Sequence, residues 1–265
     1  MTLVVAHRGS SAAHAEHTLA AYEKAVEEGA DALECDVRLT KDGVLVCVHD
    51  RRVNRTSDGR GVVSTLELAE LAELDFASWK AGQGDQLLEA NWVEYDPEQG
   101  KVLTLERLLQ LVESCGRRVE MHIETKHPTR YGGLVERSLV DLLERYGLAK
   151  PASMAESAVT IMSFAPTSLR RIHQLAPDVP TVYLMSRVPL LYRDGSLPSR
   201  IPIAGPSLEI LQAHPRYVER LHASGNRVHV WTVDEVADIE MVLGLGVDAV
   251  ISNHPRRVLR QLDRA

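Results

Sequence analysis

The chain has 265 residues, which fits one large domain or two small ones, and α/β barrels of about 250 residues commonly form a single domain. Hydrophobic residues make up 45% of the chain and charged residues 25%, which excludes a disordered, collagen-like or coiled-coil protein. Thirty basic residues stand against 37 acidic ones, so the formal net charge is −7. We therefore expect neither a nucleic-acid partner nor a bulk attraction to an anionic membrane.

The N-terminus and the cysteines indicate a cytoplasmic protein. The apolar run at residues 3–6 is too short for a secretory signal and ends in charge, and no stretch approaches the 18 apolar residues of a transmembrane helix. Cys35, Cys47 and Cys115 are odd in number and do not have metal-ligand spacing, so no disulfide framework is expected. Cys35 and Cys47 lie in apolar runs and are predicted to be buried thiols.

Strand-like and helix-like segments alternate from one end of the chain to the other. In chain order the pattern predicts a strand at 3–6, a helix at 18–28, a strand at 32–39, a turn at 40–43, a strand at 44–48, a helix at 105–115, a strand at 119–124, a helix at 133–146, a strand at 158–163, a helix at 166–175, strands at 181–185 and 201–204, a helix at 215–223, a strand at 227–233, a helix at 234–243 with Asp234 as N-cap, a strand at 247–252 and a helix at 255–262.

This order gives about eight β-then-α steps once the arm at 44–48 is set aside as part of a hairpin. Repeated β-α units predict a parallel sheet, and eight of them in about 250 residues predict a closed (β/α)8 TIM barrel, an α/β fold. Residues 51–102 are not needed for a barrel and are rich in Gly, Glu, Asp and Gln. We therefore expect one domain over residues 1–265, with a small insertion at about 51–102 after the second strand unit.

Polar and charged residues follow the predicted strands at the end where barrels of this kind build their sites. The residues that we expect at this end are His7-Arg8-Gly9, Glu34 and Asp36, His49-Asp50, Glu124 and Lys126, Ser163-Phe164, and Trp231-Thr232. A packed core rejects such charges unless they are paired, so their concentration at strand ends indicates a site.

Three of these residues are candidate metal ligands. Glu34 and Asp36 are two residues apart on a strand and leave the same face, where two carboxylates repel each other. Together with Glu124 they form a hard oxygen set that suits Mg²⁺ or Ca²⁺, with Mn²⁺ or Zn²⁺ as further options. The alternative is that Glu34 and Asp36 form buried ion pairs with Arg38 and Lys126.

Two histidines add a different chemistry. His7 and His49 stand at separate strand ends, and imidazole titrates near neutrality, so the pair could act as general acid and general base. Arg8 and Lys126 supply fixed positive charge that suits a phosphate oxygen. The alternatives are histidines satisfied in the core and cations paired with the carboxylates.

Five motifs occur in a fixed order, and together they resemble those of the glycerophosphodiester phosphodiesterase family. They are His7-Arg8-Gly9, Glu16-His17-Thr18, Glu34-Cys35-Asp36-Val37, His49-Asp50 and Glu124-Thr125-Lys126. The resemblance covers residues 3–255, and the insertion falls where that family carries one. It implies a TIM barrel and a metal-dependent hydrolase that converts glycerophosphodiesters into sn-glycerol 3-phosphate and an alcohol such as choline, ethanolamine or glycerol.

The resemblance also implies roles for individual residues. Glu34, Asp36 and Glu124 match the family's metal ligands, and His7 and His49 match its acid–base pair. Arg8 and Lys126 match residues near the phosphate, and Trp231 matches an aromatic residue on the glycerol side of the pocket. We expect Glu16, His17 and Asp50 to support these groups from behind, although His17 stands where the family usually has asparagine.

The sequence departs from the family pattern in two places. The family usually has Pro-Glu-Asn-Thr where this chain has Ala15-Glu16-His17-Thr18, and we interpret His17 as an adapted supporting contact, with a third catalytic histidine as the alternative. Near the end the chain has Asn253-His254-Pro255 where the family often has an acidic residue before Arg-Pro. We expect this change to be minor.

The resemblance leaves parts of the chemistry open. The nucleophile is either water or the glycerol 2-hydroxyl, and either histidine could be the acid. Trp79, Trp92 and Tyr95 either cover the pocket mouth, where aromatic faces would favour a quaternary ammonium group, or pack the insertion onto the barrel.

Three other functions compete with this one. A lysophospholipase D would need an apolar groove, for which residues 188–192 are the candidate. A glycerophosphodiester-binding barrel without turnover has no need of the two histidines. A sugar-phosphate enzyme would have a glycine-rich loop after the seventh or eighth strand, and residues 233–235 and 252–254 contain no glycine. The sequence does not indicate an oligomeric state.

Overall fold

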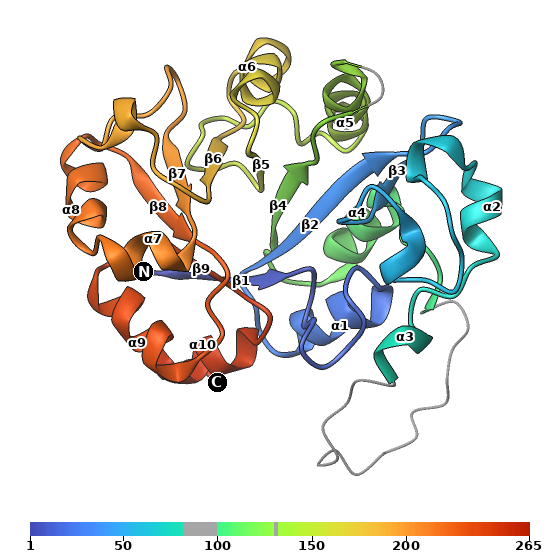
Figure 1. The fold of residues 1–265 in the computed structure, drawn as a ribbon, viewed down its shortest axis with the longest axis horizontal. Helices are drawn as coiled ribbons and strands as arrows, with labels where there is room; N and C mark the ends of the chain where they lie inside the picture. Colours follow the sequence, from blue (N-terminus) through green and yellow to red (C-terminus); the bar gives the residue numbers. More distant parts are fainter. Residues whose placement is uncertain (82–99, 130–131) are drawn as a thin grey trace.

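The computed structural model of the chain describes residues 1–81, 100–129 and 132–265. Strands occupy the centre and helices surround them (Figure 1). Of the helices in these described ranges, none is long and apolar enough to cross a bilayer.

Eight parallel strands of the described chain close into a barrel. Their order around it is β1-β9-β8-β7-β6-β5-β4-β2, and β2 returns to β1 in the register His7 opposite Glu34. The (β/α)8 barrel predicted from the alternation is thus confirmed. The strands are β1 (Leu3–His7), β2 (Ala32–Leu39), β4 (Glu120–Thr125), β5 (Val159–Ser163), β6 (Thr181–Met185), β7 (Ile203–Pro206), β8 (Arg227–Val230) and β9 (Ala249–Ser252).

A ninth strand, β3 (Leu45–Cys47), pairs antiparallel with β2 and forms the predicted hairpin. The Thr40 hydroxyl donates to the Asp42 carboxylate at the turn, and Gly43 takes the left-handed backbone conformation that such a turn requires. The hairpin carries the chain outward, so His49 and Asp50 return to the barrel mouth from outside the ring of strands.

Helices form the outer layer of the barrel. They are α1 (Leu19–Glu27), α4 (Leu105–Ser114), α5 (Leu134–Arg145), α6 (Pro166–Leu175), α7 (Leu208–Ala213), α8 (Arg216–Ala223), α9 (Val236–Gly244) and α10 (Pro255–Gln261). Thr18 and Thr104 cap α1 and α4 through their side chains, and proline begins α6 and α10, where its missing N–H has no cost. Apolar side chains between helices and strands fill this layer, and a separate apolar cluster that includes Val5, Met162 and Ile203 fills the barrel interior.

The structure differs from the predicted elements most clearly in three places. Strand β8 ends at Val230, three residues before the predicted end at residue 233. A short helix, α7, follows β7 and was not predicted. Asp234 was predicted to cap the helix after β8, but Glu235 occupies that position. The Asp234 carboxylate instead accepts hydrogen bonds from Ser252 and Asn253 at the end of β9. The helix therefore starts two residues later than its sequence pattern predicts.

The described part of the segment 51–102 holds short elements: η1 (Val53–Arg55), η2 (Val63–Thr65), α2 (Leu68–Ala72) and α3 (Ser78–Ala81). Its apolar residues form a small cluster of their own around Val53, Val63 and Leu71. The indole N–H of Trp79 donates to the carbonyl of Phe76, whereas Trp92 and Tyr95 lie outside the described residues. Elsewhere in the fold, Cys35 and Cys47 are buried free thiols, as predicted.

Candidate active site

Three carboxylates converge at the carboxyl ends of two neighbouring strands. Glu34 and Asp36 lie on one face of β2, and Asp36 is directly opposite Glu124 of β4. One oxygen from each of the three carboxylates lies within 4.8 Å of the others, and the residues are only 1%, 1% and 7% exposed. The structure therefore brings together the three residues predicted as metal ligands.

The three carboxylates differ in how easily they ionise. Burial, together with the charge of Asp36, raises the pKa of Glu124 to about 8 and that of Glu34 well above its usual value. Burial opposes ionisation of Asp36 too, but Lys126, His17 and Arg8 hold its pKa well below the ordinary range. Repulsion within this buried set would be relieved by a divalent cation. Carboxylate oxygens are the ligands that hard cations such as Mg²⁺ and Ca²⁺ prefer, so the donor set fits such an ion.

Lys126 and Arg8 contribute positive charge to the cluster. The ammonium of Lys126 lies 3.1 Å from Asp36 and 2.9 Å from Glu124. The guanidinium of Arg8 lies 3.1 Å from Asp36 and 2.9 Å from Glu16, and the Arg8 backbone N–H donates to Glu34. The alternative of buried ion pairs therefore holds for Lys126 but is wrong for Arg38, which donates both hydrogen bonds to the carbonyl of His49.

His17 lies behind the carboxylates and contacts one of them. Its Nε2 is 2.8 Å from Asp36 and its Nδ1 is 2.8 Å from the hydroxyl of Tyr22. Burial lowers the pKa of His17, so the ring is neutral. The carboxylate of Asp36 only accepts, so Nε2 donates to it and His17 fixes its direction, while the Tyr22 hydroxyl beside Nδ1 donates to the carbonyl of Glu34. This geometry agrees with a supporting contact.

His7 is oriented by residues from the last strand. Its Nδ1 lies 2.7 Å from the amide oxygen of Asn253, and Asn253 donates its own amide and backbone N–H groups to Asp234. An amide oxygen only accepts, so Nδ1 carries the proton and Nε2 keeps a free lone pair. Burial and the charge of Arg8 lower the pKa of His7 to about 4.

His49 is held by a carboxylate and by the segment that follows it. Its Nδ1 lies 2.7 Å from Asp50, whose other oxygen accepts from Arg55 at 2.8 Å. Arg55 also donates to both oxygens of Glu16, at 2.7 and 2.8 Å. Burial and the charges of Arg8 and Lys126 lower the pKa of His49, and Asp36 and Asp50 oppose this shift. Glu16 and Asp50 are thus linked through an arginine that the sequence did not single out.

Two groups at this site were not predicted from the sequence. Arg55 carries no motif, but its position five residues after His49-Asp50 places it at the barrel mouth. Asn253 was expected to be minor, yet it contacts His7. The contact could have been predicted from the closed barrel, because the last strand of a closed barrel lies beside the first and so brings Asn253 close to His7.

Seven of the predicted site residues line one cavity of about 110 Å³ at the carboxyl ends of the strands: His7, Arg8, Glu34, His49, Glu124, Lys126 and Trp231. Trp231 donates its indole N–H to the carbonyl of Gly205 at 2.7 Å. Its ring meets that of Phe164 edge to face, with centroids 5.3 Å apart. Trp231 follows β8, which lies across the barrel from β4, whereas Phe164 follows β5, the neighbour of β4.

Comparison with known proteins agrees with this arrangement. The model of the glycerophosphoryl diester phosphodiesterase family matches residues 7–257. The chain is 45% identical to "Probable glycerophosphodiester phosphodiesterase 1" of Mycobacterium tuberculosis over 262 residues, which cover 98% of this chain and 92% of the relative. It is 34% identical to the glycerophosphodiester phosphodiesterase of Bacillus subtilis, over 96% of this chain and 84% of that protein.

A solved structure has the same fold. An Oleispira antarctica phosphodiesterase in complex with its product sn-glycerol-3-phosphate superposes with a TM-score of 0.80 at 25% identity, covering 99% of this chain and 97% of that one.

Proposed function

This chain belongs to the glycerophosphoryl diester phosphodiesterase family, and on that premise we propose that it hydrolyses glycerophosphodiesters to sn-glycerol 3-phosphate and an alcohol, using a divalent metal and two histidines. One observation carries the proposal: two buried carboxylates, two cations and two oriented imidazoles line a single cavity, and the buried carboxylate of Asp36 lies within 4.8 Å of the two that line it. The relatives named above carry the same activity in their names, and the structural neighbour holds sn-glycerol-3-phosphate as its product.

Glu34, Asp36 and Glu124 would hold the metal, with Mg²⁺ or Ca²⁺ favoured because all three ligands are carboxylates. A bound divalent cation supplies Lewis-acid polarisation of a phosphoryl oxygen. Arg8 and Lys126 keep the surroundings of the phosphate positive, and this charge favours the additional negative charge of the transition state. His17 maintains the orientation of Asp36 throughout the reaction.

Each of the two histidines would carry out one of the two proton transfers that the reaction needs. Cleavage breaks the bond between phosphorus and the leaving oxygen, so one proton must leave the nucleophile and one must reach the alcohol. His7 is neutral and presents a free Nε2 lone pair because Asn253 occupies Nδ1, which suits the base. His49 is bonded to the carboxylate of Asp50, which opposes the lowering of the His49 pKa by burial and so favours an imidazolium, and this suits the acid. The nucleophile is either water or the glycerol 2-hydroxyl.

A leaving-group comparison tests this division of roles. A nitrophenyl ester of glycerol phosphate needs little protonation of its leaving oxygen. We expect His49→Ala to lose about 10²–10⁴-fold in kcat on glycerophosphocholine but to retain most activity on the nitrophenyl ester. His7→Ala should lose activity on both substrates. Equal losses for the two variants on both substrates would contradict the assignment.

A substrate and metal panel tests the function itself. Glycerophosphocholine, glycerophosphoethanolamine, glycerophosphoglycerol and lysolipids would each be assayed with Mg²⁺, Ca²⁺, Mn²⁺ and Zn²⁺, with release of sn-glycerol 3-phosphate as the readout. Activity that survives exhaustive chelation would exclude the metal, and binding without turnover would favour a glycerophosphodiester-binding barrel. Solvent-oxygen labelling and a search for cyclic phosphate would separate the two nucleophiles.

One observation favours a second candidate, lysophospholipase D activity. Leu190 and Leu191 lie in η4 (Leu190–Tyr192), after β6, and are 76% and 80% exposed. Two neighbouring exposed leucines could contact the acyl chains of a micelle. Turnover of lysolipid micelles that falls in the double variant Leu190→Ser, Leu191→Ser, while glycerophosphocholine turnover is kept, would support this activity.

A further inference from the structure

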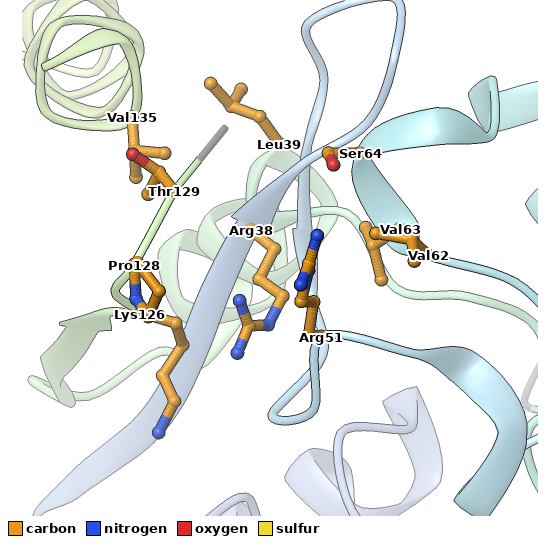
Figure 2. A pocket seen from close by; sticks show the side chains of 10 residues that line it. All are labelled: Arg38, Leu39, Arg51, Val62, Val63, Ser64, Lys126, Pro128, Thr129 and Val135. Atoms are coloured by element: carbon orange, nitrogen blue, oxygen red, sulfur yellow. The ribbon is translucent and has the colours of Figure 1, made fainter. Parts of the chain in front are cut away.

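A second cavity, of about 200 Å³, lies beside the proposed catalytic cavity, and Lys126 lines both. Figure 2 shows that its walls come from β2, from the chain after β3, from η2, from the chain after β4 and from α5. Leu39, Val63 and Val135 make much of its surface apolar. The volume is several times the roughly 30 Å³ that a water molecule occupies in the liquid, so a small charged group with a few carbons fits.

The polar groups of this cavity are mainly cationic. Arg38 and Arg51 line it together with Lys126, and none of the described lining residues is acidic. Lys126 is already paired with Asp36 and Glu124, so Arg38 and Arg51 are the cations that remain. The cavity therefore carries the opposite sign of charge to the protein as a whole, whose formal net charge is −7.

Neither arginine forms an ion pair with a carboxylate of the described chain. The Arg38 guanidinium donates to the carbonyl of His49, a neutral acceptor, and the guanidinium of Arg51 has no hydrogen bond or ion pair among the described residues. Burial lowers the pKa of Arg38, and the charge of Arg51 adds to this effect although nearby carboxylates oppose it. Two guanidinium groups that repel each other in a shared cavity favour a bound anion.

The position of the cavity identifies which end of a substrate reaches it. Trp231, at the end of β8, resembles the family's aromatic residue on the glycerol side. β8 is separated from β2 by β9 and β1, and from β4 by β7, β6 and β5, so Trp231 and Arg38 stand on opposite sides of the barrel mouth. A phosphodiester whose glycerol faces Trp231 would therefore direct its other alcohol toward Arg38 and Arg51.

We infer that this cavity is a subsite for the leaving alcohol, and that Arg38 and Arg51 select alcohols carrying a second anionic group such as a phosphate. The inference rests on the proposed function and refines its substrate class. Neutral or cationic alcohols would gain nothing from the two guanidinium groups.

The test compares glycerophosphoglycerol with the same diester carrying a phosphate on its leaving glycerol. The readout is the ratio of kcat/KM for the phosphorylated substrate to that for the neutral one. We expect Arg51→Gln to lower this ratio about tenfold and Arg51→Glu to lower it further, because a charge-assisted hydrogen bond is lost and then replaced by repulsion. Arg52→Gln is the matched control, because Arg52 is also exposed but does not line the cavity, and its ratio should equal that of the wild type.

The outcomes separate this inference from the proposed function. If Arg51→Gln turned over both substrates with the wild-type ratio of kcat/KM values, the subsite would be wrong while the proposed function stood. The same conclusion would follow if Arg52→Gln lowered this ratio as much as Arg51→Gln. Wild-type protein that turns over neither diester with any of the four metals would overturn the proposed function and the subsite with it. Arg38 is left unchanged in this test because it also holds the backbone of His49.

Discussion

The ring of His7 is held by Asn253, whose amide oxygen lies 2.7 Å from Nδ1, although 246 positions separate the two residues. Asp234 holds Asn253 in turn, through a 2.6 Å bond from the amide and a 2.8 Å bond from the backbone N–H. A chain of three residues from three strand ends therefore determines which nitrogen of His7 faces the cavity.

Asn253→Leu should remove this orientation without removing the imidazole. We expect kcat to fall about tenfold or more and KM to change little, since the ring can turn away from the nucleophile. Asn54→Leu, at an exposed asparagine whose side chain accepts from Gly61, is the control. Steady-state kinetics would check this, with the melting temperature showing that the fold is kept. A variant with unaltered kcat would contradict the role given to Asn253.

Replacing Glu124 with a neutral residue should lower activity without lowering the stability of the metal-free protein. In chelator at about pH 9, above the raised pKa of Glu124, Glu124→Gln removes one charge from a buried like-charged set, so we expect its melting temperature to equal or exceed that of the wild type. With Mg²⁺ or Ca²⁺ the wild type should gain stability by linkage and the variant much less, because one ligand has lost its charge. Thermal unfolding with and without metal measures both effects, and turnover should fall at least 100-fold.

If Glu124→Gln lowered the melting temperature in chelator by more than about 5 °C, the ion pair with Lys126 would outweigh the repulsion among the carboxylates. Glu106→Gln provides the matched control, because Glu106 pairs with Arg145 at the surface and should change neither property.

Arg55 should act as a positioning residue for both Glu16 and Asp50. Arg55→Ala leaves two carboxylates without their shared partner, so we expect kcat to fall about tenfold. Without Arg55, the pKa of Asp50 should rise from its lowered value of about 2. On the acidic side of the pH–rate profile, the variant should therefore lose activity at a higher pH than the wild type. Arg60→Ala is the control, and an unchanged profile for Arg55→Ala would contradict this role.

The site residues on single strands could be predicted because alternation along a strand is a local property. Glu34 and Asp36 must share a face wherever the strand lies, and the structure places them so. The contacts of Arg55 with Glu16 and of Asn253 with His7 join residues far apart in sequence. They depend on which loops meet at the barrel mouth, and no local pattern encodes that.

The fold was predictable for a related reason. Eight repeats of one local pattern have a single closed arrangement, whereas element ends depend on competition between neighbours. Asp234 has the residue type of an N-cap, but Asn253 and Ser252 offer its carboxylate donors from β9, and these contacts displaced the start of α9. The helix α7 is a short segment between Ser207 and Pro215, too brief for a clear period.

His122 of β4 and His229 of β8 stack inside the barrel, with ring centroids 5.2 Å apart and planes 7° from parallel. Both are fully buried, and their ring nitrogens have no hydrogen-bond partner in the described chain. Burial lowers the pKa of His122 to about 3 and that of His229 well below its usual value. Both rings are therefore neutral in the folded protein at neutral pH.

This pair should make folding sensitive to acid. The unfolded chain binds a proton at each histidine with a pKa near 6.5, so stability is fully present above that pH and falls as the pH drops toward about 3. At pH 5 the loss from His122 alone is roughly 2 kcal/mol. In His122→Leu the drop in unfolding free energy between pH 7.5 and pH 5 should be smaller by about that amount, measured by urea denaturation. His214→Leu, at an exposed histidine, is the control and should show the same fall in unfolding free energy as the wild type. If His122→Leu also showed the wild-type fall, the buried pair would not be what couples folding to pH.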